Sequence, residues 1–193
     1  MSRNKERIIN SAYELFHSNG YNQTSVDDIL KASGVRKSNF YYHFQTKEHL
    51  GITVLNMRIA NYESDVLLKT LGNSKLKPSR KLKEFYKAVQ SIHLKSQCEK
   101  GCPFGNLALE MSNSNENFRT ILSDFFDSWR DKILDCILEG IESGEFRSDL
   151  QAKYIAELVL SHLHGAILMV KTHRSILPLK DGSKTIMNLL KAA

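Results

Sequence analysis

The sequence SGVRKSNFYYHFQTKE, residues 33–48, combines a turn, a short helix and the start of a further helix. Gly34 can adopt the positive φ that a tight turn between two helices requires. The segment after it, roughly residues 36–43, is rich in hydrogen-bond donors, and we expect Phe40 and Phe44 to be its buried side. A short helix that is covered with donors is typical of a segment that enters the major groove of DNA.

The helices on either side of this stretch can also be predicted. Apolar residues at helical spacing indicate a first helix that ends at Gly20, a residue suited to a left-handed cap. Thr24 and Ser25 each precede an aspartate by three residues, so either can begin the second helix with a capping box. Thr46 can cap the helix that follows, which we expect to run to about Leu71.

The rest of the chain carries a helical pattern as well. Pro78 can open a helix, and apolar stripes follow over residues 107–111, 118–133 and 152–172. Pro178 and Gly182 are expected to separate the last of these from a short final helix over residues 182–192. Since no strand alternation or repeat is visible, we predict an all-α fold. It would comprise a three-helix domain with a helix-turn-helix at 1–47 and a larger ligand-binding and dimerisation domain at 48–193.

The composition is that of an ordinary soluble protein. The 193 residues are 41% hydrophobic and 25% charged, and no apolar run approaches the ~18 residues of a membrane span. Because the N-terminus also lacks the apolar core of a signal peptide, we expect a cytoplasmic location and no membrane partner. The formal net charge of +6 favours polyanionic partners weakly.

The basic residues are not concentrated in the donor-rich segment. Residues 1–50 hold seven basic and five acidic residues, whereas residues 69–100 hold nine basic and two acidic ones. We interpret the second cluster as a solvated helix face, and long-range attraction to phosphates is the alternative.

The cysteines do not predict a cofactor. The chain has three cysteines, Cys98, Cys102 and Cys136. An odd number of cysteines in a chain without a predicted signal peptide argues against a disulfide framework. Cys98 and Cys102 lack nearby His or Cys partners at zinc spacing. We therefore expect no metal and no cofactor.

The donors of the short helix suit nucleic acid. Lysine and arginine match guanine edges or phosphates, asparagine matches adenine, and tyrosine and serine match phosphates. The competing interpretation is a solvated helix with two core aromatic residues. The candidate DNA-binding residues are Ser25, Arg36, Lys37, Ser38, Asn39, Tyr41, Tyr42, His43 and Lys47.

In this region the chain resembles the TetR family of bacterial transcriptional regulators. The matching motifs are the Thr24-Ser25-Val26 start, Gly34-Val35, the run from Lys37 to Phe44, and Lys47-Glu48. The resemblance is specific over residues 5–50, and beyond them it lies mainly in the layout of helices. It implies a DNA-binding regulator, most often a homodimeric repressor that a small-molecule effector releases from a palindromic operator.

The resemblance also implies roles by position. Arg36, Lys37 and Asn39 would face base edges, and Tyr41 and His43 would reach phosphate or base edges. Ser25 and Lys47 would bind phosphate at helix starts, whereas Phe40 and Phe44 would be core. Two residues depart from the common pattern: Asn39, where a small Ser or Thr is frequent, and Gly51, where Leu is frequent. The first bears on operator choice, and the second could loosen the helix that contains it.

The segment 152–172 is apolar on more than one face, which suggests that it is buried twice. A single helix-turn-helix covers too few base pairs for useful specificity, so such proteins dimerise on palindromes. The resemblance implies a homodimer through helices near 152–172 and 182–192. A central core helix is the alternative for residues 152–172.

A ligand pocket is the remaining expectation for the larger domain. Residues 101–106, GCPFGN, resemble a Gly-Cys-Pro-x-Gly-Asn element of one branch of the family, where it opens a short helix beside the pocket. Aromatic stripes are more often plain core than ligand contacts. The candidate ligand-binding residues are Tyr86, Cys102, Phe104, Asn106, Leu109, Phe125, Trp129 and His162, with His164 as the alternative to His162.

Cys102 admits a second reading. A cysteine near a helix N-terminus can have a lowered pKa, and Lys100 would help, so Cys102 could sense electrophiles or oxidants with Cys98 as resolving thiol. A small buried residue behind a turn is the alternative, and we favour it modestly.

Other functional classes are less well supported. An enzyme would have to use Glu110, His162, His164 or Cys102, which form no motif at catalytic spacing. A non-specific DNA binder would show steep salt dependence without preference for a palindrome, and a purely structural dimer would not bind DNA.

Overall fold

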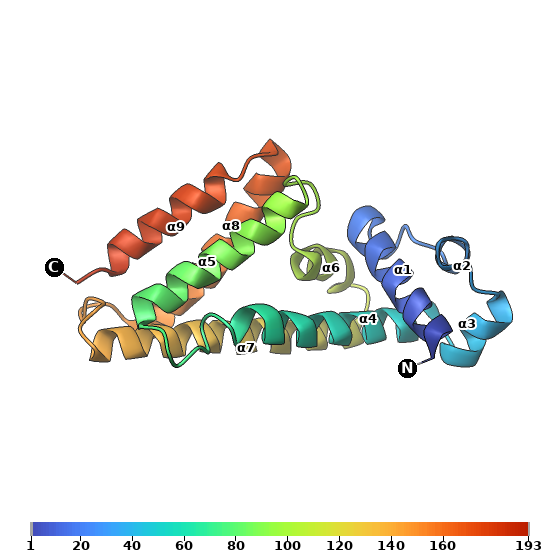
Figure 1. The fold of residues 1–193 in the computed structure, drawn as a ribbon, viewed down its shortest axis with the longest axis horizontal. Helices are drawn as coiled ribbons and strands as arrows, with labels where there is room; N and C mark the ends of the chain where they lie inside the picture. Colours follow the sequence, from blue (N-terminus) through green and yellow to red (C-terminus); the bar gives the residue numbers. More distant parts are fainter. Residues whose placement is uncertain (1, 193) are drawn as a thin grey trace. The chain divides into compact units, whose positions relative to one another are not determined.

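The computed structural model describes residues 2–192, and within them the fold is all-α, as predicted. Residues Phe146 and Lys191 form an isolated β-bridge, and the described chain has no β-strand. The elements, labelled in Figure 1, are α1 (Arg3–Asn19), α2 (Val26–Ser33), α3 (Lys37–His43), α4 (Lys47–Tyr62), the π-helix η1 (Glu63–Leu67), α5 (Pro78–Lys95), α6 (Pro103–Met111), α7 (Glu116–Glu142), α8 (Ala152–His173) and α9 (Leu177–Leu190).

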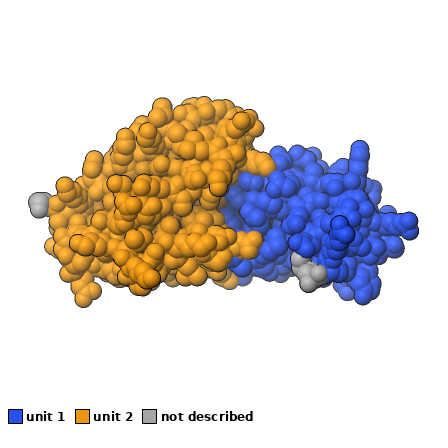
Figure 2. Space-filling model, viewed as in Figure 1, with its two compact units in different colours: residues 1–60, 103–122 blue, residues 61–102, 123–193 orange. Residues whose placement is uncertain are grey.

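The chain divides into two compact units, coloured separately in Figure 2. Unit 1 comprises Met1–Ala60 and Pro103–Leu122, and unit 2 comprises Asn61–Cys102 and Ser123–Ala193. This division differs from the boundary expected after residue 47. Unit 1 retains most of α4 because Leu50 and Val54 are part of its core, and it also includes α6, which is remote in sequence.

Unit 1 is built on α1, against which α2 and α3 pack. The expected burial of Phe40 and Phe44 is confirmed, because their side chains are almost inaccessible to solvent. The buried core of this unit consists of Ile8, Ile9, Ala12, Ile29, Val35, Phe40, Phe44, Leu50 and Val54.

The local signals of the donor-rich segment are confirmed in unit 1. Ser25 and Asp28 form a reciprocal capping box at the start of α2. Gly34 has φ +62° in the turn before α3, as that turn requires. Thr46 accepts a hydrogen bond from the His49 amide at 3.0 Å and so caps α4.

Two helix boundaries differ from the sequence prediction. The helix from Lys47 stays α-helical to Tyr62 and continues as a π-helix to Leu67, rather than running unbroken to Leu71. The final helix begins at Leu177, so Pro178 and Gly182 lie inside it. Proline is tolerated there because the first turn of a helix does not use its amide groups. Gly182 lies under the His162 imidazole, which a Cβ atom at that position would overlap.

Unit 2 contains α5, α8, α9 and the larger part of α7. Helices α5 and α8 each pack against α9. Its fully buried side chains include the aromatic residues Phe85, Tyr86 and Trp129 together with Leu82. The core of unit 2 is therefore aromatic as well as aliphatic.

Helix α8 has the length and apolar character of a membrane span by composition alone. It is 22 residues long, and a third of its apolar window is buried inside the chain. One such helix is weak evidence for a membrane, because the core helix of a soluble protein has the same properties.

Candidate DNA interface and effector site

Helix α3 presents a polar surface to solvent. Lys37 and Ser38 are exposed on its first turn, and Arg36 is exposed at its N-cap. Tyr41 is 49% exposed and Tyr42 is 82% exposed, although tyrosine rings are usually more covered. These candidate DNA-binding residues thus share one accessible element, which the buried Phe40 anchors in unit 1.

Two other candidates for this interface have side-chain partners within the protein, and a third is half-buried. His43 is half-buried, and its Nε2 lies 3.1 Å from the Ser2 hydroxyl at the N-cap of α1. The Ser25 hydroxyl donates to the Asp28 carboxylate at 2.6 Å. That hydrogen bond holds the Asp28 pKa below its usual value. Asn39 is half-buried, so its amide is less open than the lysine and tyrosine side chains.

Lys47 lies against the turn between α1 and α2. Its Nζ is 3.5 Å from the Asn22 carbonyl oxygen and 4.3 Å from the centre of the Tyr21 ring. Burial lowers the pKa of Lys47, and the Glu110 carboxylate opposes that shift. The expected phosphate-binding residue is therefore also part of the packing of this turn.

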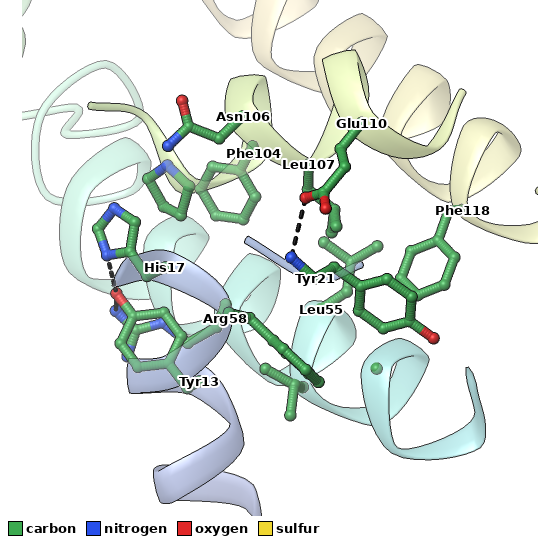
Figure 3. Close-up of a pocket in the computed structure, with 14 residues that line it drawn as sticks. Tyr13, His17, Tyr21, Leu55, Arg58, Phe104, Asn106, Leu107, Glu110 and Phe118 are labelled. Atoms are coloured by element: carbon green, nitrogen blue, oxygen red, sulfur yellow. Dashed lines mark hydrogen bonds between the residues drawn. The ribbon is translucent and has the colours of Figure 1, made fainter. Parts of the chain in front are cut away.

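The partner of that turn is Glu110, on helix α6. Its carboxylate accepts hydrogen bonds from the backbone amides of Tyr21, at 2.9 Å, and Asn22, at 2.6 Å. Figure 3 shows the first of these bonds. Burial, together with Glu48 and Glu110, raises the pKa of Tyr21 to about 12. Helix α6 is thereby fastened to the loop that positions the start of α2.

From the sequence Glu110 is only a catalytic candidate, and its contact with this turn was not predicted. Eighty-nine residues separate Glu110 from Tyr21, and no local pattern connects them. Gly51 completes the arrangement, since a Cβ atom there would overlap the rings of Tyr21 and Phe118. The glycine thus permits close packing of α4, whereas the sequence had suggested a loosened helix.

A small cavity of about 40 Å³ lies inside unit 1, between α1, α4 and α6 (Figure 3). Phe104 and Asn106, both predicted ligand residues, line it. Opposite them the Arg58 guanidinium donates to the Tyr13 hydroxyl at 2.8 Å and stacks on its ring. A space this small accommodates water or a very small ligand, whereas drug-sized effectors need about 300 Å³ or more.

Three other predicted ligand residues, Tyr86, Phe125 and Trp129, are aromatic and lie in unit 2. Trp129 is the centre of their cluster. The centroid of its ring lies 4.8 Å from that of Tyr62, 5.7 Å from that of Phe125 and 5.9 Å from that of Phe85. Tyr86 packs beside Phe85. We call this group, with Phe126 and His164, the aromatic cluster.

Two buried donors of the aromatic cluster lack hydrogen-bond partners. They are the Tyr86 hydroxyl and the Trp129 indole nitrogen, on side chains that are 2% and 1% exposed. A buried polar group without a partner costs about 1–3 kcal/mol. A ligand that brings an acceptor would remove this cost.

Cys102 lies at the edge of the aromatic cluster, beside His164. Its Sγ is 3.9 Å from His164 Nε2, the separation of a long thiol hydrogen bond. The other ring nitrogen, Nδ1, lies 3.0 Å from the Leu160 carbonyl oxygen. Burial lowers the pKa of His164, which favours the neutral ring. Because a carbonyl can only accept, Nδ1 carries the proton, and Nε2 offers its lone pair to the thiol.

The remaining candidates are placed elsewhere. His162, the residue selected from the sequence, packs against Gly182 of α9, and its Nδ1 has no hydrogen-bond partner. Leu109 is 84% exposed on α6 and lines neither the cavity nor the aromatic cluster. The eight predicted ligand residues therefore do not form one site.

The three cysteines are thiols in different settings. Cys136 is 1% exposed, and burial raises its pKa to about 12. Cys98 is buried in a turn where its φ is +60°. Within residues 2–192, no group of three or more His, Cys, Asp or Glu side chains could hold a metal ion.

Comparison with known proteins identifies the family. Residues 8–52 match the model for bacterial regulatory proteins of the tetR family, and residues 78–185 match that for the C-terminal domain of LmrA/YxaF-like transcriptional regulators. The second model alone covers more than half of the chain.

Individual relatives agree. The chain is 30% identical over 175 residues to the HTH-type transcriptional repressor DhaR of Mycobacterium sp. (strain GP1), covering 91% of this chain and 86% of that one. It is 28% identical to the HTH-type transcriptional regulator LmrA of Bacillus subtilis, covering 97% and 96%. The crystal structure of regulatory protein TetR from Rhodobacter sphaeroides superposes with a TM-score of 0.89 at 26% identity, covering 98% of this chain and all of that one. The chain therefore belongs to the TetR family of bacterial transcriptional regulators.

Proposed function

We propose that this regulator is a homodimeric repressor that binds a palindromic operator and is released by a small-molecule effector. The observation that carries the DNA-binding part is the exposed donor surface of α3 on a buried aromatic anchor. Arg36 and Lys37 contact base edges or phosphates there, and Tyr41 and Tyr42 add phosphate contacts.

Exposed apolar residues on α8 and α9 support the dimer. Soluble chains seldom expose so many large apolar side chains on two neighbouring helices. A two-fold axis would pair α8 and α9 with their copies in a four-helix interface and present two α3 helices to successive major grooves. The residues are Tyr154 (65% exposed), Leu158 (49%), Leu168 (52%), Met169 (42%), Leu177 (56%) and Leu189 (53%).

The effector site belongs to the aromatic cluster of unit 2. The partnerless donors of Tyr86 and Trp129 support this, because a bound acceptor would satisfy them. The cavity in unit 1 is too small for such a ligand. This regulator works in the cytoplasm, where its operator is, and it does so by binding rather than by turnover.

Helix α6 couples the effector site to the DNA-binding helices α2 and α3. It begins one residue after Cys102, and through Glu110 it holds the amides of Tyr21 and Asn22. An effector that shifts the start of α6 changes this hold and hence the setting of α2 and α3. A coupling free energy of ~1–3 kcal/mol is typical of such transitions.

A second candidate, a thiol-based sensor on the same scaffold, is favoured by the contact between Cys102 and His164. An enzyme would use the same pair. Turnover of any compound that disappears in Cys102→Ser would establish catalysis and end the pure regulator hypothesis.

The experiment is fluorescence anisotropy on duplex DNA from just upstream of the regulator's own gene, with a scrambled duplex of equal length as control. We expect tight binding that prefers the natural sequence by about a thousandfold or more, the usual ratio for specific regulators. Equal affinity for both duplexes across natural upstream fragments would contradict the specific repressor.

A further inference from the structure

We propose that Cys102 and His164 form a nucleophile–base pair through which the regulator adds covalently to an α,β-unsaturated carbonyl compound. This inference deepens the proposed function, on which its DNA-binding consequence rests, by naming the effector's chemical class.

The His164 imidazole is oriented to act as a base. His164 Nδ1 donates to the Leu160 carbonyl at 3.0 Å, which leaves Nε2 as an acceptor 3.9 Å from the Cys102 sulfur. The rings of Phe126 and Trp129 pack edge-on against the imidazole, with ring centroids 5.0 Å and 5.4 Å from its centroid, and hold it in place. An adjacent base of this kind raises the reactivity of a thiol at neutral pH.

The three thiols differ in their surroundings. Cys102 keeps 8% of its surface open to solvent, whereas Cys136 keeps 1% and donates to the Pro78 carbonyl. Burial holds the pKa of Cys136 at about 12, so that thiol stays protonated. Cys98, at 5% exposed, is close to Cys102 in accessibility, so the adjacent base is what distinguishes Cys102 from it.

The aromatic cluster also offers hydrogen-bond donors to a ligand. The Trp129 indole N–H and the Tyr86 O–H are buried donors without partners in the cluster that holds His164. A carbonyl oxygen would accept from such a donor, and the aromatic rings suit a flat, unsaturated carbon skeleton. These groups favour a conjugated carbonyl compound over an aliphatic cation or a peroxide.

The addition balances without an oxidant. The Cys102 sulfur attacks the β-carbon and forms the C–S bond as His164 Nε2 takes the thiol proton. The C=C π bond breaks and its electron pair forms an enolate, whose oxygen accepts a hydrogen bond from Trp129. His164 then returns the proton to the α-carbon, and the product is a saturated thioether. This is general acid–base catalysis of one addition.

The adduct lies where it can affect the DNA-binding helices α2 and α3. Cys102 directly precedes α6, and the same helix ends with Glu110 bound to the Tyr21 and Asn22 amides. A bulky thioether at residue 102 displaces the start of α6 and weakens that attachment. DNA affinity falls as a result.

The first test uses the full-length protein and N-ethylmaleimide, a cyclic α,β-unsaturated carbonyl compound, with peptide mapping by mass spectrometry. We expect Cys102 to react at least tenfold faster than Cys98 or Cys136. His164→Gln should slow Cys102 about tenfold, whereas His173→Gln, at the exposed end of α8, should leave the rate unchanged. Equal rates in the wild type and His164→Gln would overturn the pair.

A pH profile separates a base from a merely structural histidine. The groups that face His164 are Cys102, which precedes α6, and the rings of Phe126 and Trp129 on α7, and Tyr62 adds a titratable hydroxyl near Cys102. With an internal base, the wild-type rate is nearly flat between pH 7 and 9. In His164→Gln it should rise about tenfold per unit, as for an ordinary thiol below its pKa of about 8.5. A tenfold rise in the wild type would contradict the proposal.

The carbonyl contact has its own control. Trp129→Phe should slow maleimide addition severalfold more than it slows the reaction with methyl methanethiosulfonate, which has no carbonyl group. A peroxide that oxidises Cys102 while maleimide fails to add would overturn the assignment of ligand class.

The last arm measures operator affinity before and after labelling. We expect at least a tenfold loss in the wild type and no response in Cys102→Ser. Labelling of Cys102 without loss of affinity would overturn the sensor role. An unlabelled protein that binds no DNA would count against the proposed function alone, because the labelling rates are measured without DNA.

Discussion

Units 1 and 2 differ in one respect: within residues 2–192, the buried side-chain polar atoms without a hydrogen-bond partner lie in unit 2 and not in unit 1. In unit 1 the Tyr13 hydroxyl, the Tyr21 and Asn22 amides and the Arg58 guanidinium all have partners. In unit 2 the Tyr86 hydroxyl and the Trp129 indole nitrogen are buried without one. A DNA-binding surface must hold one geometry, whereas an empty ligand-binding site can retain donors that lack hydrogen-bond partners. The contrast supports the proposal that unit 1 binds DNA and unit 2 binds the effector.

The largest expected effect is on the DNA-facing side of this contrast. Replacing both Arg36 and Lys37 with alanine should lower operator affinity about 100-fold or more, because each good base-edge contact contributes ~1–3 kcal/mol. Both side chains are exposed, so the melting temperature should not change. Anisotropy titrations and thermal unfolding check this.

The matched control for that prediction is the pair Lys75→Ala and Lys184→Ala, which removes the same charge from exposed positions of unit 2. It should weaken binding far less and equally on specific and scrambled DNA. A loss as large as that of the α3 variant would assign DNA recognition to general charge.

Removal of the Glu110 carboxylate should break the attachment of α6. In Glu110→Ala the amides of Tyr21 and Asn22 lose their acceptor, and the free energy of unfolding should fall by about 2 kcal/mol, as for hydrogen bonds to a charged group. Urea denaturation measures the change. Glu142→Ala, on the last turn of α7, is the control and should have little effect.

The same variant sharpens the functional side of the comparison. If α6 carries the signal, Glu110→Ala should still bind effector but release DNA less completely. Normal release would show that coupling takes another path.

Gly51→Ala tests how tightly unit 1 is packed. The added methyl group would meet the rings of Tyr21 and Phe118, which outweighs the helix propensity gained, and we expect a net loss of about 1 kcal/mol. Phe118→Leu on the same background makes room and should recover part of it. A more stable Gly51→Ala protein would show that the helix was loosened by its glycine after all.

The smallest effect concerns single hydroxyl groups. Tyr86→Phe removes a buried hydroxyl without a partner, so stability should stay equal or rise by up to about 1 kcal/mol. Tyr13→Phe removes the acceptor of the 2.8 Å bond from Arg58 and should cost about 1 kcal/mol. Thermal unfolding of both variants gives the sign, and equal losses would abolish the contrast between the units.

The residues with local meaning were predicted correctly. Gly34, Thr46, the Ser25–Asp28 box and the burial of Phe40 and Phe44 all follow from chain neighbours within four positions. Such signals depend on backbone φ, amide capping and helical periodicity, which a sequence displays directly. They determined the all-α fold and the helix-turn-helix.

The ligand residues show where sequence reasoning ended. Helical spacing cannot say to which core a residue of α6 belongs, so the sequence prediction placed Phe104, Asn106 and Leu109 in one site with Trp129. It also could not choose between His162 and His164, which lie two positions apart and point to different neighbours: Gly182 for the first, Cys102 for the second.

The sequence by itself thus determined the helical fold, the helix-turn-helix and the resemblance to the family. Tertiary structure alone decided that Glu110 holds a turn 89 residues away, that Gly51 makes room for two rings, and that Cys102 faces a neutral imidazole. The physical reason is the distance along the chain between the residues that interact. Capping and periodicity act within a turn of the chain, whereas hydrogen bonds and ring contacts between remote segments exist only after the helices have packed.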